Sequence, residues 1–254
     1  MATVRGASRS LRAFVRAFPF LAVVATSACS HESAPPADAS NASTERGTAP
    51  SSPDGVAAPG GASVFVVHEI QDFDAFKKYL DEGAAEREKA GVKGYLLTKL
   101  DDGRVVVHFF AEKLAEVKAA LDSPELQRYL NRAGAPEASL VWLASDEVVR
   151  VPASPPTGKT YSLFYKLKTA DFAAFKRAFE GRFAVYAEQG VIAEGLHRSV
   201  SNDDMLFVHF VGTDREKLAA LQKRPEFVEL LALAGGADAA KPLLGEDVAR
   251  SRPK

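Results

Sequence analysis

The chain has 254 residues, enough for one large domain or two small ones. Hydrophobic residues make up 46% of it and charged residues 26%, an ordinary balance for a globular protein. The formal net charge of −1 gives no electrostatic footprint for nucleic acid, and a single cysteine excludes an intramolecular disulfide.

Residues 1–29 have the layout of an export signal. An arginine-rich start without acidic residues precedes a short apolar run, residues 17–25, which is too short to span a bilayer as a helix. The run ends in small residues followed by the only cysteine: Thr26, Ser27, Ala28 and Cys29. This resembles a bacterial lipoprotein signal peptide, although the family usually has leucine where Thr26 stands.

The lipoprotein resemblance implies that Cys29 is lipidated, becomes the mature N-terminus and anchors the protein in the bacterial cell envelope. Ser30 follows the cysteine instead of aspartate, which favours the outer membrane over the inner one. An ordinary secretory signal with a chance cysteine is the alternative. Residues 30–62 are rich in Ala, Ser, Pro and Gly and have few large apolar residues, so we expect a disordered tether.

Beyond the tether, the sequence repeats itself. An acidic turn followed by an apolar run with one histidine occurs at residues 101–110 and again at 203–211. His108 and His209 lie 101 residues apart (209 − 108), and the same offset relates Pro124 to Pro225. We therefore expect a first repeat over 63–150, a linker over 151–160, a second repeat over 161–249 and a disordered basic tail over 250–254.

Each repeat is predicted to run strand, helix, strand, strand, helix, strand. Asp72 and Asp171 are typical N-caps, Gly91 and Gly190 are typical helix ends, and Asp101-Asp102-Gly103 is a hairpin turn. In the first repeat, the expected strands are 64–70, 92–100, 104–110 and 139–143, with helices over 73–90 and 114–133, the second restarting at Ser123-Pro124. In the second repeat, they are 161–167, 191–200, 205–211 and a weak 243–248, with helices over 172–189 and 218–233.

This order is that of a ferredoxin-like α+β unit with an antiparallel sheet, in which the first and third strands are central. The third strand is apolar on both faces, with Val105 and Val107 on one face and Val106 and Phe110 beside His108 on the other. A half-solvated sheet would alternate apolar and polar residues. One face must therefore meet the helices and the other a second sheet, which the second repeat supplies by packing face to face.

Three sequence features resemble the dimeric α/β-barrel superfamily, which includes the antibiotic-biosynthesis-monooxygenase-like proteins. They are the Asp-Phe-x-x-Phe-Lys helix start, the turn at Ala90-Gly91-Val92 and the Ser-Pro-Glu-Leu helix at 123–126. The resemblance covers about residues 63–249 and implies a barrel closed within one chain. The superfamily includes cofactor-free oxygenases, haem-degrading enzymes, isomerases and proteins without a known reaction, so the fold does not fix the chemistry.

Histidines are the candidate site residues. His108 and His209 are equivalent in the two repeats, and His68 is expected on a strand adjacent to His108, as is His197 to His209. A catalytic role for His108, His209 or His68 competes with the plainer interpretation that each is a hydrogen-bonded strand residue. Helical metal-binding spacings, cysteines in the folded part, nucleophile elbows and phosphate loops are absent from the sequence, so we expect neither a metal nor a cofactor.

Two functional hypotheses follow. The first is an envelope lipoprotein whose barrel binds a small apolar ligand or a protein partner, with the fused barrel compatible with a monomer. The second is a cofactor-independent monooxygenase or isomerase-like enzyme with His108 or His209 as base. Histidines that point into a cavity between the sheets favour the enzyme, and histidines packed under helices favour the binding module.

Overall fold

The computed structural model describes residues 61–121, 124, 140–152, 154–236 and 241–251. The predicted signal peptide with Cys29, nearly all of the tether, and most of the helix restart after Ser123 lie outside these residues. No helix in the described ranges is both long and apolar enough to cross a bilayer.

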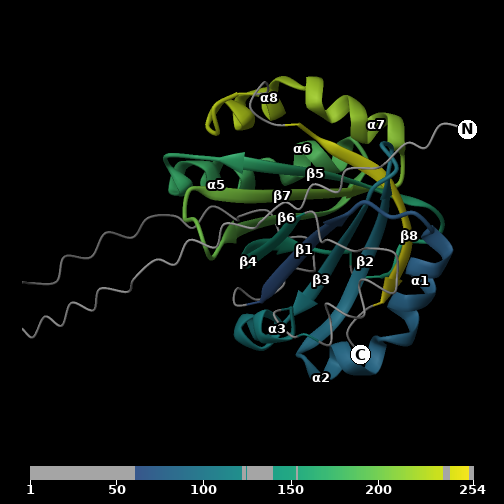
Figure 1. Ribbon diagram of the computed structural model, residues 1–254. Helices are drawn as coiled ribbons and strands as arrows, with labels where there is room; N and C mark the ends of the chain where they lie inside the picture. The colour runs from purple at the N-terminus through teal and green to yellow at the C-terminus, as the bar shows by residue number, and fades with distance from the viewer. Residues whose placement is uncertain (1–60, 122–123, 125–139, 153, 237–240, 252–254) are drawn as a thin grey trace, which may run out of the picture. The chain divides into compact units, whose positions relative to one another are not determined.

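Eight strands form a closed barrel with helices on its outside (Figure 1), in the order β1-β3-β2-β8-β5-β7-β6-β4. Half of this order, β4-β1-β3-β2, is the ferredoxin-like arrangement, and β8-β5-β7-β6 repeats it. The predicted α+β fold, with the halves closed into a barrel, is confirmed. The strands are β1 (Ala62–His68), β2 (Val92–Leu100), β3 (Val105–Ala111), β4 (Leu140–Arg150), β5 (Thr160–Lys168), β6 (Val191–Ser199), β7 (Met205–Gly212) and β8 (Leu243–Ser251).

Two seams join the halves, and both are antiparallel. At one seam β2 pairs with β8, where Thr98 faces Asp247, and at the other β4 pairs with β6, where Asp146 faces His197. Because every neighbouring pair is antiparallel, β1 and β5, four places apart, run in the same direction. The pseudo-two-fold axis that relates the repeats therefore lies along the barrel axis.

Helices lie where the caps were predicted, but each long first helix is broken in two. Asp72 and Asp171 accept hydrogen bonds from the backbone N–H groups of Ala75 and Ala174, as N-caps do. The first helix of repeat one breaks at Gly83, where the backbone leaves helical geometry. The first helix of repeat two breaks after Gly181, and there Arg182 is the residue that leaves helical geometry. The helices are α1 (Phe73–Glu82), α2 (Ala84–Lys89), α3 (Leu114–Leu121), α5 (Phe172–Glu180), α6 (Phe183–Glu188), α7 (Arg215–Ala220), the short 3-10 helix η1 (Leu221–Lys223) and α8 (Pro225–Ala232).

The fourth strand of each repeat is longer than predicted. β4 continues to Arg150 and β8 to Ser251, so Arg250 and Ser251 belong to the sheet and not to a disordered tail. Each of these strands gains a second partner from the opposite repeat, β6 for β4 and β2 for β8. Backbone pairing across the seams thus supports polar segments that the apolar pattern of the sequence did not identify as strand.

Alternation along the strands divides the core into an inner and an outer part. On β1, Phe65 and Val67 pack inside the barrel with residues of both repeats, whereas Val64 and Val66 pack outside with Val117 of α3. The largest outer cluster belongs to the second repeat, where α5, α6 and α8 bury aromatic side chains: Tyr165, Phe175, Phe179, Tyr186, Phe210 and Phe227. Each fully buried Phe side chain contributes roughly 1.5–3 kcal/mol of transfer free energy.

Candidate functional site

Three histidines meet inside the barrel: His108 of β3, His197 of β6 and His209 of β7. The ring centroid of His108 lies 5.4 Å from that of His197 and 5.4 Å from that of His209. Each side chain is buried, with exposed fractions of 2%, 1% and 6% in chain order. The barrel interior is therefore where the ionisable groups of the two repeats come together.

His68 lies on the strand next to that of His108, as expected, but its side chain does not join this group. The cross-strand partner of His108 on β1 is Phe65, three residues before His68, so the two histidines lie on opposite faces of the sheet. His68 packs under α1, with its ring centroid 5.3 Å from that of Phe76. Burial lowers its pKa to about 4.

His108 and His209 are held in the same way by the two repeats. The Nε2 atom of His108 lies 2.8 Å from Ser63 Oγ, and that of His209 lies 3.1 Å from Ser162 Oγ. Each ring also stacks on a phenylalanine, Phe65 at 4.1 Å and Phe164 at 4.4 Å between centroids. Burial, reinforced by the neighbouring histidines, lowers the pKa of His108 well below its usual value and that of His209 to about 3. Both rings are therefore neutral at physiological pH.

His197 is held differently, by a carboxylate. Its Nδ1 lies 2.7 Å from Asp146 Oδ1, across the seam between β6 and β4. Since an ionised carboxylate only accepts hydrogen bonds, Nδ1 carries the proton and Nε2 carries a free lone pair. This Nε2 is buried and has no hydrogen-bond partner among the described residues. An imidazole with one nitrogen oriented by a carboxylate can accept a proton on the other nitrogen where a substrate reaches it, and in this structure Nε2 packs against Gly195.

Gly195 makes room for this ring. A Cβ at position 195 would collide with Nε2 and would lie 2.9 Å from Cε1 of His197. In the first repeat the equivalent residue is Leu96, because Leu96 pairs with His108 as Gly195 pairs with His209. The ring of His197 therefore occupies space that a side chain fills in the other repeat.

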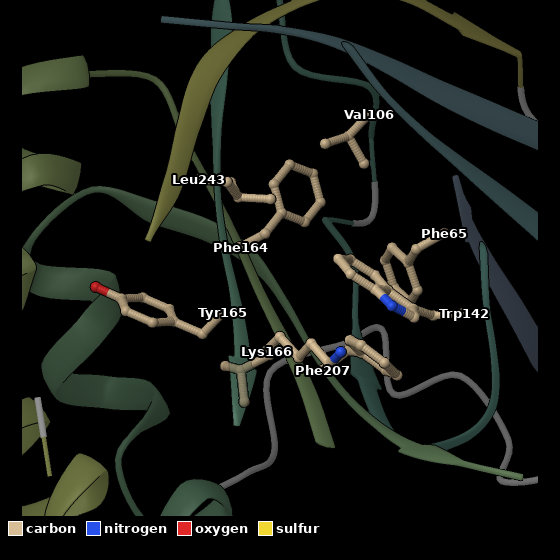
Figure 2. A pocket seen from close by; sticks show the side chains of 9 residues that line it. Phe65, Val106, Trp142, Phe164, Tyr165, Lys166, Phe207 and Leu243 are labelled. Atoms are coloured by element: carbon tan, nitrogen blue, oxygen red, sulfur yellow. The ribbon is translucent and has the colours of Figure 1, made fainter. Parts of the chain in front are cut away.

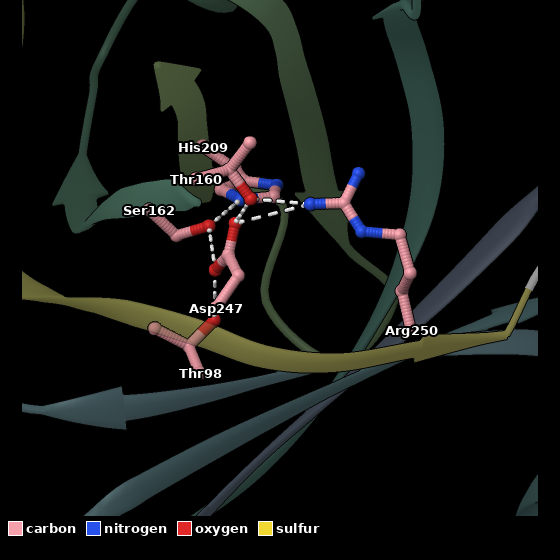
Figure 3. Close-up of polar contacts among 6 residues, drawn as sticks. All are labelled: Thr98, Thr160, Ser162, His209, Asp247 and Arg250. Atoms are coloured by element: carbon pink, nitrogen blue, oxygen red, sulfur yellow. Dashed lines mark hydrogen bonds and ion pairs between the residues drawn. The ribbon is translucent and has the colours of Figure 1, made fainter. Parts of the chain in front are cut away.

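Asp146 has a counterpart, Asp247, which holds no histidine. Figure 3 shows its carboxylate accepting hydrogen bonds from the hydroxyl groups of Thr98 at 2.8 Å, Thr160 at 2.7 Å and Ser162 at 2.7 Å. Arg250 lies 3.9 Å away. Burial raises the pKa of Asp247, and the three hydroxyl donors oppose that rise. This carboxylate joins β8 to β2 and β5 and is a structural tie.

Ser162 connects the Asp247 carboxylate to His209 (Figure 3). Because its hydroxyl donates to Asp247, its oxygen accepts from His209, which therefore carries its proton on Nε2. His209 thus serves as a donor at the end of a hydrogen-bond chain. The repeat pattern in the sequence points to His108 and His209 but not to the Asp146–His197 pair. The signal was available, because Asp146 and Asp247 share the 101-residue offset of the twin histidines (247 − 146).

A small apolar pocket, lined by residues of both repeats, lies beside the inner aromatic side chains Phe65, Phe164 and Phe207 (Figure 2). Its free volume is about 10 Å³, room for about one water molecule. Two of its lining residues, Phe65 and Phe207, are the cross-strand partners of His108 and His197, and no histidine lines the pocket itself. Trp142 and Leu243 are partly exposed and Lys166 is exposed. The lining residues are Phe65, Val106, Trp142, Phe164, Tyr165, Lys166, Phe207, Val208 and Leu243.

No protein-family model matches the sequence, and no curated protein sequence matches it. Solved structures do match. A candidate monooxygenase from Fusobacterium nucleatum subsp. nucleatum is 9% identical with a TM-score of 0.58, over 76% of this chain and 95% of that one. A candidate monooxygenase from Lactobacillus acidophilus is 13% identical with a TM-score of 0.52, over 76% and 97% of the two chains. An anthrone oxidase-like protein is 8% identical with a TM-score of 0.54, over 76% and 94%.

The chain has the dimeric α/β-barrel fold. The resemblance predicted from the sequence is therefore confirmed at the level of fold, with both repeats of the barrel in one chain. At these identities the likeness extends to the fold alone, and the chemistry of this α/β barrel depends on its own residues. In the described part of the chain, no group of three or more His, Cys, Asp or Glu side chains is arranged to hold a metal ion.

Proposed function

We propose that the barrel interior is a general-base site of a cofactor-independent enzyme, a monooxygenase or an isomerase, acting on a small planar aromatic substrate. The observation that carries this proposal is the buried Nε2 of His197, which has no partner among the described residues while Asp146 fixes Nδ1 at 2.7 Å. A base in this state binds a proton without first losing a hydrogen bond.

The Asp146 contact makes His197 the favoured base over the histidines proposed from the sequence. The Nδ1 of His108 is also buried without a partner among the described residues, but His108 and His209 each contact a serine and no carboxylate through Nε2, and burial lowers their pKa values. His68 lies on the outer face of β1, away from the interior. The proposed base is therefore the one barrel histidine that is paired with a carboxylate within the described residues.

The reaction begins with transfer of a proton from an acidic C–H or phenolic O–H group of the substrate to Nε2. Asp146 stabilises the imidazolium that forms, and the apolar walls exclude water. Return of the proton at another carbon completes an isomerisation. In the oxygenase, an activated methylene supplies four electrons to O₂, one oxygen atom becomes the product carbonyl and the other leaves as water. The monooxygenase-like and anthrone oxidase-like names of the structural neighbours support O₂ as the second substrate.

Substrate entry requires side chains at the pocket to move, because about 10 Å³ is far less than an aromatic ring needs. The partly exposed Trp142 and Leu243 are placed to turn outward, and Phe207 then stands between the opening and His197. The nearly filled interior is also what a binding module with a small apolar ligand would present. That second candidate predicts binding without turnover.

Oxygen consumption with anthrone as substrate tests the proposal. We expect His197→Gln to lower the rate by at least about 100-fold, because general-base catalysis contributes roughly that much. His209→Gln, which retains hydrogen-bonding capacity on the same inner face, is the matched control and should retain most of the rate. Circular dichroism of both variants checks the fold. An unchanged rate in His197→Gln overturns the assignment of the base, and binding of anthrone without oxygen consumption favours the binding module.

We also propose, on the sequence pattern alone, that the enzyme is lipid-anchored through Cys29 in the cell envelope, at the outer membrane. Cys29→Ser should release the protein from membrane fractions or leave an unprocessed precursor. A wild-type protein recovered wholly in the soluble fraction, with Cys29 unmodified by mass spectrometry, would contradict the anchor and leave the barrel chemistry untouched.

A further inference from the structure

We infer that Lys166 makes the small apolar pocket selective for planar aromatic anions such as aromatic carboxylates. This inference rests on the proposed function, because it names the substrate class of the same site. Three observations carry it: a cation on the inner face of the barrel, aromatic walls around it, and the absence of a counter-charge within the described part of the chain.

Lys166 follows Ser162 and Phe164 along the inner face of β5. Its ammonium nitrogen lies 5.3 Å from the centroid of the Trp142 ring, a cation–π contact at the rim of the pocket (Figure 2). Its counterpart on β1 is Val67, 99 residues earlier (166 − 67), which is fully buried in the inner core. The positive charge therefore stands on one side of the pseudo-two-fold axis only.

No carboxylate among the described residues forms an ion pair with Lys166, whereas Lys168, two residues further along the strand, pairs with Asp204 at 3.9 Å. An unpaired ammonium group on a pocket rim is free to receive an anionic ligand group. When an anionic ligand binds, the Lys166 ammonium group can replace its cation–π contact with Trp142 by a contact with the ligand carboxylate, so its charge keeps a favourable partner.

Aromatic side chains make up the pocket walls beside this cation. Trp142 stacks on Phe207 with 4.8 Å between ring centroids and 20° between ring planes, and Phe65 and Phe164 lie deeper. Flat walls of this kind favour a planar ring by stacking. A ring placed against Phe207 lies next to His197, its cross-strand partner, while a carboxylate on the ring reaches back to Lys166.

Trp142 is the only tryptophan in the chain, so its fluorescence reports binding at this pocket directly. The probes are 4-nitrobenzoate and 4-nitrobenzamide, two quenchers of nearly the same shape that differ in charge. We expect the wild type to bind the carboxylate about fivefold more tightly than the amide, the size of a solvent-accessible ion pair. Lys166→Met should bind both equally, Lys166→Arg should keep the preference, and Lys168→Met is the control that should also keep it.

Equal affinity of the wild type for the two probes would overturn the inference, as would a preference that survives in Lys166→Met. Quenching by neither probe would overturn it as well. None of these results decides the proposed base, because anthrone carries no charge and the oxygen assay with His197→Gln does not depend on Lys166. Loss of the carboxylate preference in Lys166→Met alone supports the inference whatever the oxygen assay shows.

Discussion

Asp146 and Asp247 occupy the same place in the two repeats, yet Asp146 binds the imidazole of His197 and Asp247 binds three hydroxyl groups. They lie 101 residues apart (247 − 146), each on the fourth strand of its repeat and each across a seam from its partner. One carboxylate orients a base, and the other fastens three strands.

Replacement of Asp146 by leucine should free the His197 ring. Nδ1–H loses its acceptor, so we expect the free energy of unfolding to fall by about 1–3 kcal/mol. Nitrogen-15 NMR of the histidine rings should show that the Nδ1–H tautomer of the wild type is lost. Asp146→Asn, whose amide oxygen still accepts, should keep that tautomer. A wild-type spectrum with the proton of His197 on Nε2 would contradict the proposed base.

Replacement of Gly195 by alanine should displace His197 from Asp146. The new methyl group would overlap the ring, and overpacking of this kind typically costs about 1–3 kcal/mol. Gly181→Ala is the matched control, because its Cβ would meet only backbone oxygens at 3.5 and 3.9 Å. Thermal unfolding should separate the two variants clearly. Equal melting temperatures would mean that the interior has more room around His197 than the structure shows.

Replacement of Asp247 by alanine should weaken the seam between β2 and β8. Three buried or partly buried hydroxyl groups lose their acceptor, and we expect a loss of about 2–4 kcal/mol in urea denaturation. Thr98→Val removes one of the three hydrogen bonds in a nearly isosteric change and should cost about 1 kcal/mol. A smaller loss for Asp247→Ala than for Thr98→Val would show that the carboxylate costs more to bury than its partners return.

The buried histidines should make the protein lose stability in acid. Burial lowers the pKa of His68 to about 4, so the folded state keeps it neutral while the unfolded chain protonates it below about 6.5. Its contribution is therefore present above pH 6.5 and falls by about 1.4 kcal/mol per pH unit between pH 6.5 and pH 4. His68→Leu should reduce the measured slope by that amount. Denaturation curves at several pH values check this, and an unchanged slope would mean that His68 is solvated.

Glu194 should act in the opposite direction. Burial raises its pKa to about 7 even though Arg150 lies 2.6 Å away and favours the charged form. The folded state then holds a proton that the unfolded chain releases near pH 4.5, so this group loses stability as pH rises from 4.5 to 7. Relative to the wild type, Glu194→Gln should gain about 1.4 kcal/mol per pH unit across this window. A constant difference between the two proteins would show that the ion pair holds Glu194 charged throughout.

The repeat, the strand order and the central place of the third strand in each half of the sheet followed from the sequence, because apolar runs and turn residues are local signals. The twin histidines His108 and His209 were found for the same reason. The tautomer-fixing pair was not, because Asp146 meets His197 only across a seam that barrel closure creates. The strands of His68 and His108 are adjacent, as predicted, but the sequence did not show that the two side chains lie on opposite faces, because β1 is apolar on both faces.

A barrel assembled from two identical chains would carry every inner residue twice, on both sides of its axis. In this chain, a substitution changes one side only. Gly195 and His197 therefore stand opposite Leu96 and Thr98, and Lys166 stands opposite Val67. Covalent fusion thus allows inner residues of one repeat to be substituted while the equivalent residues of the other repeat continue to pack the barrel interior.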